Sequence, residues 1–153
     1  MKLIIGSLLV LFDFLSKKII FNFIELNKLI SIMPFIDITH IHNYGIAFGL
    51  FSGVLPLFIV LLGVIILIFL LFWMFNISNT FEKWGVLFLI AGAISNIGDR
   101  LLNNYVLDFI FLHYKQYYWP AFNFADIYIS VGVLIIVIES YKIFKTRLKG
   151  TND

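Results

Sequence analysis

Long apolar runs separated by short polar stretches divide the chain into four segments, each long enough to cross a bilayer. A helix needs about 20 residues to cross a hydrocarbon core of about 30 Å. The segments that meet this length are residues 3–23, 54–75, 84–104 and 126–145. The second carries no charged residue, and the third carries none before Asp99. The pattern predicts an all-α membrane protein with four transmembrane helices.

The first segment is the least regular, because Asp13, Lys17 and Lys18 interrupt it. A cleaved signal peptide and a helix lying on the membrane surface are the two other interpretations. No small-x-small cleavage site follows the apolar stretch, and both flanks stay hydrophobic. We therefore predict a retained membrane helix. Asp13 and Lys17 are four residues apart and can pair on one helix face, and the lysines can also snorkel to the interface.

The two longest connections are residues 24–53 and 105–125. In the first, "PFIDITHIHNYGIAFG" is rich in β-branched residues around a glycine, which predicts short strands at the membrane surface. In the second, the Tyr/Trp cluster of "HYKQYYWPAF" is typical of an interfacial aromatic belt. We expect a single domain over residues 1–153, with a small extracytoplasmic β-rich segment between the first and second helices.

Basic residues predict the orientation. Four of them crowd at and just beyond the end of the last span, and the short linker 76–83 carries one more. Cytoplasmic loops are enriched in Lys and Arg, so both regions are expected to face the cytoplasm. The residues are Lys142, Lys145, Arg147, Lys149 and Lys83. With four spans, both termini are then cytoplasmic and the two long connections lie outside.

Composition agrees with a membrane protein and excludes several kinds of chemistry. Hydrophobic residues make up 61% of the chain and charged residues 13%, which leaves too little polar surface for a soluble fold. The net charge of +2 gives no reason to expect a nucleic-acid partner. Without cysteine, disulfides, thiolate metal sites and cysteine nucleophiles are excluded. Neither H-E-x-x-H nor G-x-S-x-G occurs.

The three histidines do not indicate a metal site. His40 and His42 alternate along one predicted strand, and the third histidine, His113, is distant in sequence. Zinc normally takes three or four protein ligands, so we interpret these side chains as interfacial. We expect no metal and no cofactor.

Candidate chemistry comes from three acids near the outer ends of the last two spans: Asp99, Asp108 and Asp126. Acids inside membrane segments mark functional sites by default. Antiparallel neighbouring helices would bring these three to one depth. Two carboxylates held close together share one proton, and aspartic peptidases use that arrangement to activate water and polarise a carbonyl.

Other interpretations remain open on residue types alone. Asp126 can be a helix cap, Asp99 can pair with a basic group, and Asp108 can be a solvated loop residue. A proton or ion pathway through Asp13, Asp108 and Asp126 is the alternative from another class of protein. A relay needs acids at several depths, whereas only Asp13 lies deep. A structural adaptor would leave the ordered Asn, Asp and Arg blocks unexplained.

Five short motifs, in order along the chain, resemble the signature blocks of the lipoprotein signal peptidase family, also called signal peptidase II. "DFLSK" begins at Asp13 and resembles the family's D-x-x-S/T-K. The others are "HNYGIAFG" from His42, "GAISNIGDR" from Gly92, "VLDF" from Val106 and "FNFAD" from Phe122. The resemblance covers essentially the whole chain.

The resemblance implies an aspartic endopeptidase of the bacterial plasma (inner) membrane, with its site toward the outer face. Such an enzyme removes signal peptides from prolipoproteins, cutting just before the diacylglyceryl-modified cysteine. The catalytic pair matches Asp108 and Asp126. Positions that line or support the site match Asn43, Gly45, Asn96, Arg100, Asn123, Asp13 and Lys17. The expected partners are lipidated prolipoproteins and membrane lipids, the enzyme is expected to be a monomer, and globomycin is expected to inhibit it.

Two positions depart from the family pattern. Ser95 stands where glycine is common, and Gly98 stands where an aliphatic residue is common. The second creates "NIGD", half of the G-x-G-D motif of presenilin-type proteases. Since Asn96 replaces the first glycine of that motif, we assign catalysis to Asp108 and treat Asp99 as structural.

Overall fold

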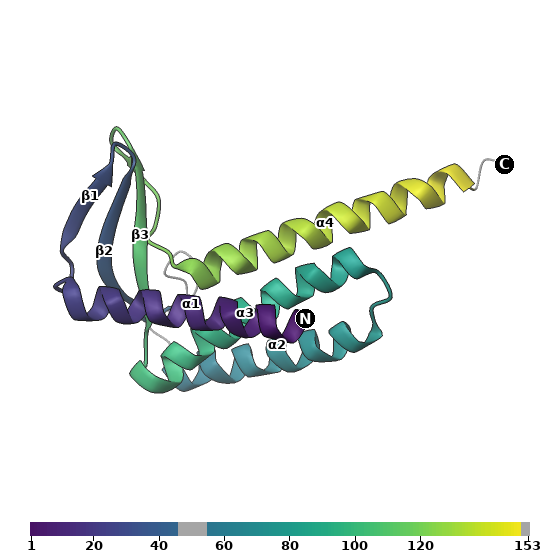
Figure 1. The fold of residues 1–153 in the computed structure, drawn as a ribbon, viewed down its shortest axis with the longest axis horizontal. Coiled ribbons are helices and arrows are strands. Elements are labelled where there is room, and N and C mark those ends of the chain that lie inside the picture. Colours follow the sequence, from purple (N-terminus) through teal and green to yellow (C-terminus); the bar gives the residue numbers. More distant parts are fainter. Residues whose placement is uncertain (46–54, 151–153) are drawn as a thin grey trace.

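In the part of the chain that the structure describes, four long helices form the body of the protein, and a small sheet lies at one end (Figure 1). The structure is a computed structural model that describes residues 1–45 and 55–150, with side chains as far as residue 148. The helices are α1 (Lys2–Phe23), α2 (Pro56–Asn76), α3 (Thr80–Asn103) and α4 (Phe124–Gly150). They overlap all four predicted spans, although Val54, the predicted start of the second span, lies outside the described residues.

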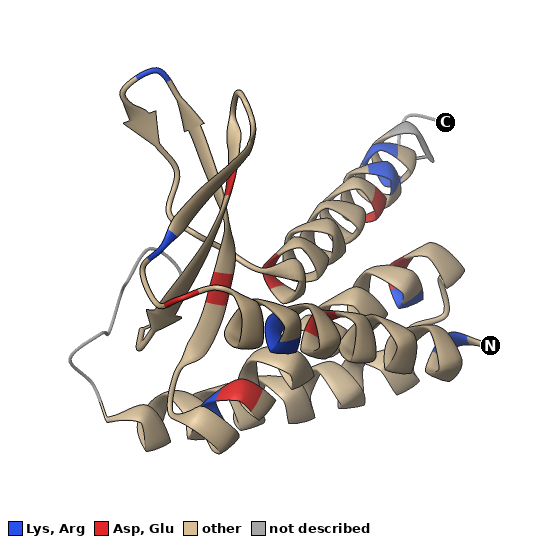
Figure 2. Cartoon of the chain, turned by 60° about the vertical axis from the view of Figure 1, so that its left-hand side comes forward, with Lys and Arg blue, Asp and Glu red and all other residues tan. Residues whose placement is uncertain are grey.

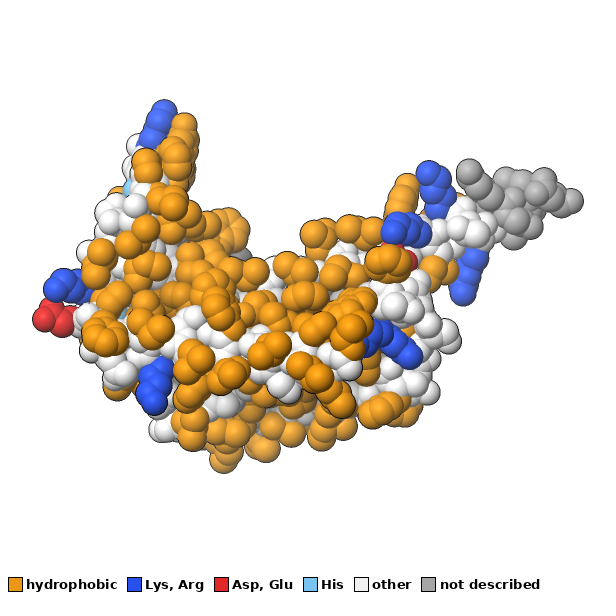
Figure 3. All heavy atoms as spheres, viewed as in Figure 1, with side chains coloured by type: hydrophobic (Ala, Val, Ile, Leu, Met, Phe, Trp, Pro, Cys, Tyr) orange, Lys and Arg blue, Asp and Glu red, His pale blue; other side chains and the backbone are white. Residues whose placement is uncertain are grey.

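Within the described residues, three of the helices are long and apolar enough to cross a membrane: α2, α3 and α4 as far as Leu148. The fourth, α1, carries Asp13, Lys17 and Lys18, and is not among them. Hydrophobic side chains cover the helices on the face shown in Figure 3, and Lys and Arg lie mainly toward the ends. This distribution is that of a membrane protein, in which lipid contacts the apolar side chains.

Helix α3 is central, because it packs against each of the other three helices. Small residues allow close approach, as is common between membrane helices. A Cβ added at Gly92 would lie 2.5 Å from the carbonyl oxygen of Ala125, and one at Gly132 would lie 2.6 Å from that of Gly85. The backbones of α3 and α4 therefore contact each other directly.

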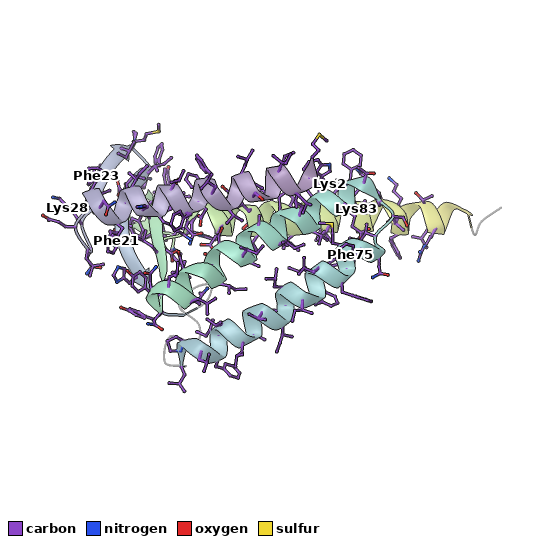
Figure 4. The ribbon with its side chains drawn as sticks, turned by 60° about the horizontal axis from the view of Figure 1, so that its bottom comes forward. Lys2, Phe21, Phe23, Lys28, Phe75 and Lys83 are labelled. Carbon is purple, nitrogen blue, oxygen red and sulfur yellow. The ribbon has the colours of Figure 1, made fainter. Side chains whose placement is uncertain are left out.

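Helix ends define two ends of the bundle. The sheet lies beside the C-terminal ends of α1 and α3, which follow Lys17 and Asn96 (Figure 1). The N-terminal ends of α2 and α4 lie at the same end of the bundle. We call this the sheet end. In Figure 4, Phe21 and Phe23 mark it, whereas Lys2 and Lys83 mark the opposite end.

Helix α3 begins four residues before the predicted span because Asn79 caps it. The Asn79 side-chain oxygen accepts hydrogen bonds from the backbone N–H groups of Phe81 and Glu82. Such a cap satisfies amides that have no partner within the helix. The same asparagine donates to Glu139 of α4 at 3.1 Å, which ties the α2–α3 connection to α4.

The sheet has four antiparallel strands in the order β1–β2–β3–β4. They are β1 (Leu29–Met33), β2 (Ile36–Asn43), β3 (Val106–Tyr114) and β4 (Tyr117–Tyr118). The prediction of strands in the first long connection is confirmed. The description as all-α with a small β-rich segment between the first two helices agrees with the four helices and with β1 and β2. It is incomplete, because β3 and β4 of the same sheet come from the connection between α3 and α4.

Pairing explains why β3 forms. Strand β2 has an edge with unpaired backbone groups, and β3 satisfies them from Ile36↔Leu112 to Asn43↔Val106. A register shift between Ile38 and Ile41 changes the pairing just before the sheet reaches the helices. The register pairs Ile41 with Asp108, and Asn43 follows Ile41 by two residues. The polar side chains of Asp108 and Asn43 therefore both lie at the sheet end of the bundle.

The close approach of α3 and α4 gives a stability prediction. We expect Gly92→Ala to lower the free energy of unfolding by about 1–3 kcal/mol, because its Cβ would overlap the backbone of α4. Gly98→Ala is the matched control, since its Cβ meets nothing within 4 Å and alanine favours helix. Thermal unfolding in detergent measures both. Equal midpoints for the two variants would contradict the packing argument.

Candidate active site

Asp108 and Asp126 lie at the junction of the sheet and the helices, linked by one asparagine. Asp108 is the third residue of β3, and Asp126 is the third residue of α4. The Asn123 side-chain Nδ2 donates to Asp108 Oδ1 at 2.7 Å, and its backbone N–H donates to Asp126 Oδ2 at 3.2 Å. Asn123 is fully buried. A single residue therefore fixes both carboxylates.

Asp126 also takes part in the cap of α4. Asn123 precedes the helix, and its Oδ1 accepts the backbone N–H of Asp126 at 3.0 Å. With the bond back to the Asn123 N–H, this is a reciprocal capping box. The second oxygen, Oδ1, accepts Asn96 Nδ2 at 2.9 Å. One oxygen of Asp126 thus takes part in the cap of α4, and the other accepts a hydrogen bond from Asn96 of α3.

Asp108 is almost completely buried, with 2% of its surface exposed. Its second oxygen accepts Asn43 Nδ2 at 2.9 Å. Burial, and then the negative charge of Asp126, raise the pKa of Asp108 to about 7, although the two asparagine donors act in the opposite direction. The interpretation of Asp108 as a solvated loop residue is wrong. Burial therefore favours the protonated form of this carboxyl.

A buried ion cluster supports the other side of the pair. Lys17 Nζ lies 2.7 Å from Asp13 Oδ2 and 2.9 Å from Asp99 Oδ2. The predicted pairing of Asp13 with Lys17 is confirmed, and so is the pairing of Asp99 with a basic group. Asp99 Oδ2 also accepts the backbone N–H of Leu107 at 3.3 Å, just before Asp108. All three charged residues are less than 10% exposed.

Lys17 determines which way Asn96 points. An ammonium group has only donors, so the Asn96 oxygen faces it, at 3.3 Å. The Asn96 amino group must then face Asp126, where it donates. Asp13 adds a second contact with α4, because its Oδ1 accepts the backbone N–H of Ala125 at 3.0 Å. Helix α1 thereby positions Asp126 from two directions.

Arg100 and Gly45 lie at the same junction. Arg100 donates to the Gly45 carbonyl at 2.6 Å and to the Asn96 carbonyl at 3.2 Å. Asn43 Oδ1 accepts the Gly45 N–H at 2.9 Å, which closes a local turn after β2. The remainder of the "HNYGIAFG" motif, residues 46–49, lies outside the described residues.

Figure 2 shows that charged positions are sparse along the helices, with acidic ones on the strands and at the start of α4.

Histidines form two separate groups on the sheet. The Nε2 atoms of His40 and His42 are 3.1 Å apart, and His113 Nε2 lies 3.2 Å from Asp37 Oδ2. Within residues 1–45 and 55–150, no group of three or more His, Cys, Asp or Glu side chains could hold a metal ion.

Every residue that the sequence singled out for the site lies in this junction, in one connected network of hydrogen bonds and ion pairs. The sequence argument left Asp99 outside the site. In the structure Asp99 contacts Lys17, which in turn contacts Asn96. The sequence did contain a signal for the role of Asp99. It follows Asn96 by three residues, so the two side chains are neighbours on the surface of one helix. Chemically, two linked carboxylates, one of them with a raised pKa, can donate and accept protons as a general acid and base.

Comparisons with known proteins agree on one family. The family model described as signal peptidase (SPase) II matches residues 5–142. The chain is 41% identical over 138 residues to the lipoprotein signal peptidase of Wigglesworthia glossinidia brevipalpis, covering 88% of this chain and 89% of the relative. It is 35% identical over 135 residues to that of Thermodesulfovibrio yellowstonii, covering 88% and 90%.

Solved structures give the same result. One bacterial membrane enzyme superposes with a TM-score of 0.86 at 33% identity, covering 92% of this chain and 87% of the other. A second superposes with a TM-score of 0.81, also at 33% identity, and covers 90% of each chain.

The ion cluster gives a second prediction. Lys17→Met leaves two buried carboxylates without a counter-ion, so we expect the free energy of unfolding to fall by about 3–5 kcal/mol. Lys18→Met is the matched control, because Lys18 is exposed, and we expect a change within about 0.5 kcal/mol. Thermal unfolding of both purified variants measures the difference. A Lys17→Met protein as stable as the control would show that the cluster does not stabilise the fold.

Proposed function

Because this chain belongs to the signal peptidase II family, we propose that it is a membrane aspartic endopeptidase whose catalytic pair is Asp108 and Asp126. Membership of the family supports removal of signal peptides from prolipoproteins. The finer proposal is that it cuts on the N-terminal side of the diacylglyceryl-modified cysteine by activating a water molecule. The observation that carries it is the pair of carboxylates held by Asn123.

The arrangement assigns different roles to the two acids. Asp108 is the protonated member, because burial and the neighbouring charge favour its neutral form. We assign to Asp126 the complementary role of taking the proton from water; its carboxylate accepts the Asn96 side-chain amide and the Asn123 backbone N–H. This split is the one that aspartic peptidases use.

The chemistry then proceeds in two balanced steps. In the first, Asp126 removes a proton from water while the oxygen adds to the scissile carbonyl carbon, and the Asp108 O–H donates its proton to the carbonyl oxygen. In the second, the proton on Asp126 passes to the leaving nitrogen as the C–N bond breaks. Asp108 takes back a proton from the new hydroxyl, which becomes the carbonyl of the carboxyl product. Both acids return to their starting states.

A proton or ion pathway fits the positions less well. Asp108, Asp126 and their asparagine donors gather at the sheet end, whereas a relay needs titratable groups along the whole span. Asp13, the deep acid, is already paired with Lys17 and caps α4.

We place α1 in the membrane as the fourth span. Its 22 residues give a helix about 33 Å long. Of its charges, Asp13 and Lys17 are buried against α3 and α4 instead of facing lipid. Lys18 is exposed close to the sheet end, from which it can snorkel to the interface. Four spans place both termini on one side, and the basic residues at the end of α4 and at Lys83 assign that side to the cytoplasm. The sheet end is then extracytoplasmic.

The lipid on the substrate would set the depth of the scissile bond. Acyl chains stay in the bilayer, and each buried methylene contributes about 0.8 kcal/mol to holding that position. The peptide bond next to the modified cysteine then meets the two acids at the membrane surface. Diacylglyceryl-modified prolipoproteins are thus the proposed substrates, membrane lipids the surroundings, and a monomer the active unit.

The catalytic assignment predicts loss of cleavage. Asp108→Asn and Asp126→Asn should each reduce turnover of a lipidated prolipoprotein by at least 1,000-fold, on the order of general acid–base contributions, because asparagine cannot carry the proton. Asp37→Asn is the control, since Asp37 is a buried acid of β2 that contacts His113 and not the pair. Purified enzymes in detergent are assayed by product mobility. Wild-type turnover by either active-site variant would rule out the dyad.

Recognition of the lipid is tested with the wild-type enzyme, which should cleave a lipidated precursor far faster than an unlipidated one. Equal rates on the two precursors in the same detergent would rule out recognition by lipid.

The pKa of Asp108 predicts the pH dependence. Because the folded-state pKa of about 7 is above the ordinary value of 3.8, the folded state binds more protons than the unfolded state between these values. The stability that this proton contributes is present at low pH and is lost as pH rises through about 7. We expect kcat/KM to fall above this pH, and wild type to lose more thermal stability than Asp108→Asn between pH 5 and 8. Parallel stability curves would contradict the raised pKa.

Orientation is tested by labelling. The chain has no native cysteine, so single-cysteine variants give an unambiguous signal. We expect an impermeant maleimide to label Tyr117→Cys in intact cells, because this exposed strand residue lies at the sheet end. Lys145→Cys, exposed near the far end of α4, should react only after the cells are opened. Labelling of position 145 from outside would reverse the topology.

A further inference from the structure

Two histidines of β2 contact each other close to the carboxylate pair but on another face of the sheet. The Nε2 atoms of His40 and His42 are 3.1 Å apart, and we call these two residues the histidine pair. On β3, Asp108 pairs with Ile41, whereas the neighbouring position pairs with His42. Side chains alternate along a strand, so His42 points away from the face that carries Asp108. Neither histidine takes part in the proposed two-acid chemistry.

A β-bulge connects the histidine pair to the site. Strand β2 pairs Ile38 with Ile110. Three residues later on β2, Ile41 pairs with Asp108, which is only two residues away on β3. This extra residue shifts the alternation of side chains, so Asn43 shares the face of Asp108 and donates to it at 2.9 Å. The geometry of the bulge therefore decides whether Asn43 reaches Asp108.

His40 lies in this bulge and attaches it to α1. Its Nδ1 lies 2.7 Å from the carbonyl oxygen of Ile24, the C-cap of α1. Its own carbonyl accepts the backbone N–H of Asn27 at 2.8 Å. Phe21, at the sheet end of α1 in Figure 4, meets the ring edge-on with centroids 5.7 Å apart. With 4% of its surface exposed, His40 is fixed between α1 and β2.

These contacts determine where the protons of the histidine pair lie. A carbonyl oxygen only accepts, so His40 Nδ1 carries a hydrogen, and the neutral ring has a bare Nε2. His42 Nε2 must then supply the hydrogen of the 3.1 Å contact. After one further proton is bound, one of the two facing nitrogens is still bare and the hydrogen bond persists. A second proton sets two N–H groups and two positive charges against each other, which breaks the contact.

The surroundings of the histidine pair disfavour that second proton. Burial, and then the charge of His40, lower the pKa of His42 below its ordinary value of 6.5. Strand β1 carries no ionisable side chain. The ionisable groups on the other neighbouring elements are two phenols, an exposed ion pair after α1, two acids that already contact a base, and an exposed lysine of α1. They are Tyr44 and Tyr105, Glu25 and Lys28, Asp37 and Asp99, and Lys18.

We propose that the histidine pair is a proton-sensitive device that positions Asn43 on Asp108. With at most one extra proton, the two rings stay in contact and hold the end of β2 on the bulge. With two, His40 remains on Ile24, because its Nδ1 still donates, and His42 is the ring that moves. Asn43 follows His42 directly in the chain, so the hydrogen bond from Asn43 to Asp108 weakens. Both histidines are thus positioning residues.

The consequence for catalysis rests on the proposed function, whereas the proton-dependent contact does not. Two pH effects then act on the site from opposite sides. Loss of the Asp108 proton lowers kcat/KM above about pH 7. Separation of the histidine pair lowers it in acid, below the ordinary histidine value of 6.5. In the proposed topology the pair lies at the extracytoplasmic end, so it responds to the pH outside the cytoplasm.

Histidine NMR in detergent micelles tests the proton-dependent contact without reference to catalysis. Near neutral pH, isotope-labelled His40 should carry its hydrogen on Nδ1 and His42 on Nε2. Between about pH 8 and pH 5 the two rings should titrate as a coupled pair, with the second proton bound at lower pH than the first. The side-chain amide signal of Asn43 should shift with that second proton. Independent titration of the two rings, or an Asn43 signal that does not respond, would overturn the proposal.

Cleavage assays with purified enzyme test the positioning role. Acidification from pH 7 to about pH 5 should lower wild-type kcat/KM by about three- to tenfold, the effect of one hydrogen bond. His42→Gln can still donate to His40 but cannot become charged, so it should lose much less over this range. His113→Gln is the matched control at the far end of the same sheet, and should keep the wild-type profile.

Two results separate the failure of this inference from that of the proposed function. An acidic loss of equal size in wild type and His42→Gln would show that the histidine pair does not position Asn43. A wild-type enzyme that cleaves no prolipoprotein at any pH would refute the proposed function, and the Asn43 amide signal would still decide whether the second proton moves this side chain.

Discussion

The start of α4 is the point on which the rest of the structure depends. A helix that begins inside protein, close to the membrane, has backbone N–H groups that water cannot satisfy. Here the side chains of Asn123 and Asp13 accept two of them, and Asp126 returns a bond to the Asn123 amide. Because the same asparagine also binds Asp108, capping the helix and joining the two carboxylates are one structural event.

This arrangement explains why so many charged groups are buried at one end of an apolar protein. Asp13, Lys17 and Asp99 are individually costly inside a membrane protein, but each contacts a partner of opposite charge. Their contacts reach Asp126 through Asn96, whose orientation a donor-only ammonium group determines. A cluster of neutral side chains could fill the same space, but it would not fix which end of the Asn96 amide meets the carboxylate.

Central placement of α3 lets one helix serve three neighbours. One face meets α4 through glycines, with Gly92 against the backbone of Ala125. Another carries Asn96 toward the carboxylate pair. A third forms one wall of a groove between α1 and α3, where Gly98 leaves open space. Glycine on this helix therefore has two different effects: it brings backbones together on one face and leaves open space beside α1 on another.

The sequence by itself determined the helices. The thickness of the bilayer requires a run of about 20 mainly apolar residues for each span, and such runs can be recognised without tertiary information. It also singled out the acids that lie at the junction, since acids near the ends of apolar segments stand out. The asparagines were implied only by motifs that resemble one family. The pairing of Asp13 with Lys17 followed from the helix period alone.

Only the tertiary structure decided how those residues meet. Strand β3 forms because the edge of β2, more than 60 residues earlier, supplies its hydrogen-bond partners, and no local pattern around Asp108 contains that edge. The same holds for Lys17 bridging Asp13 and Asp99, and for Asn123 joining both carboxylates. The Lys17–Asp99 and Asn123–Asp108 contacts join side chains on different elements, and their geometry depends on the packing of α1, α3 and α4 and on the position of β3. The depth of each span is a local property of the chain, whereas the site is a property of how the spans pack.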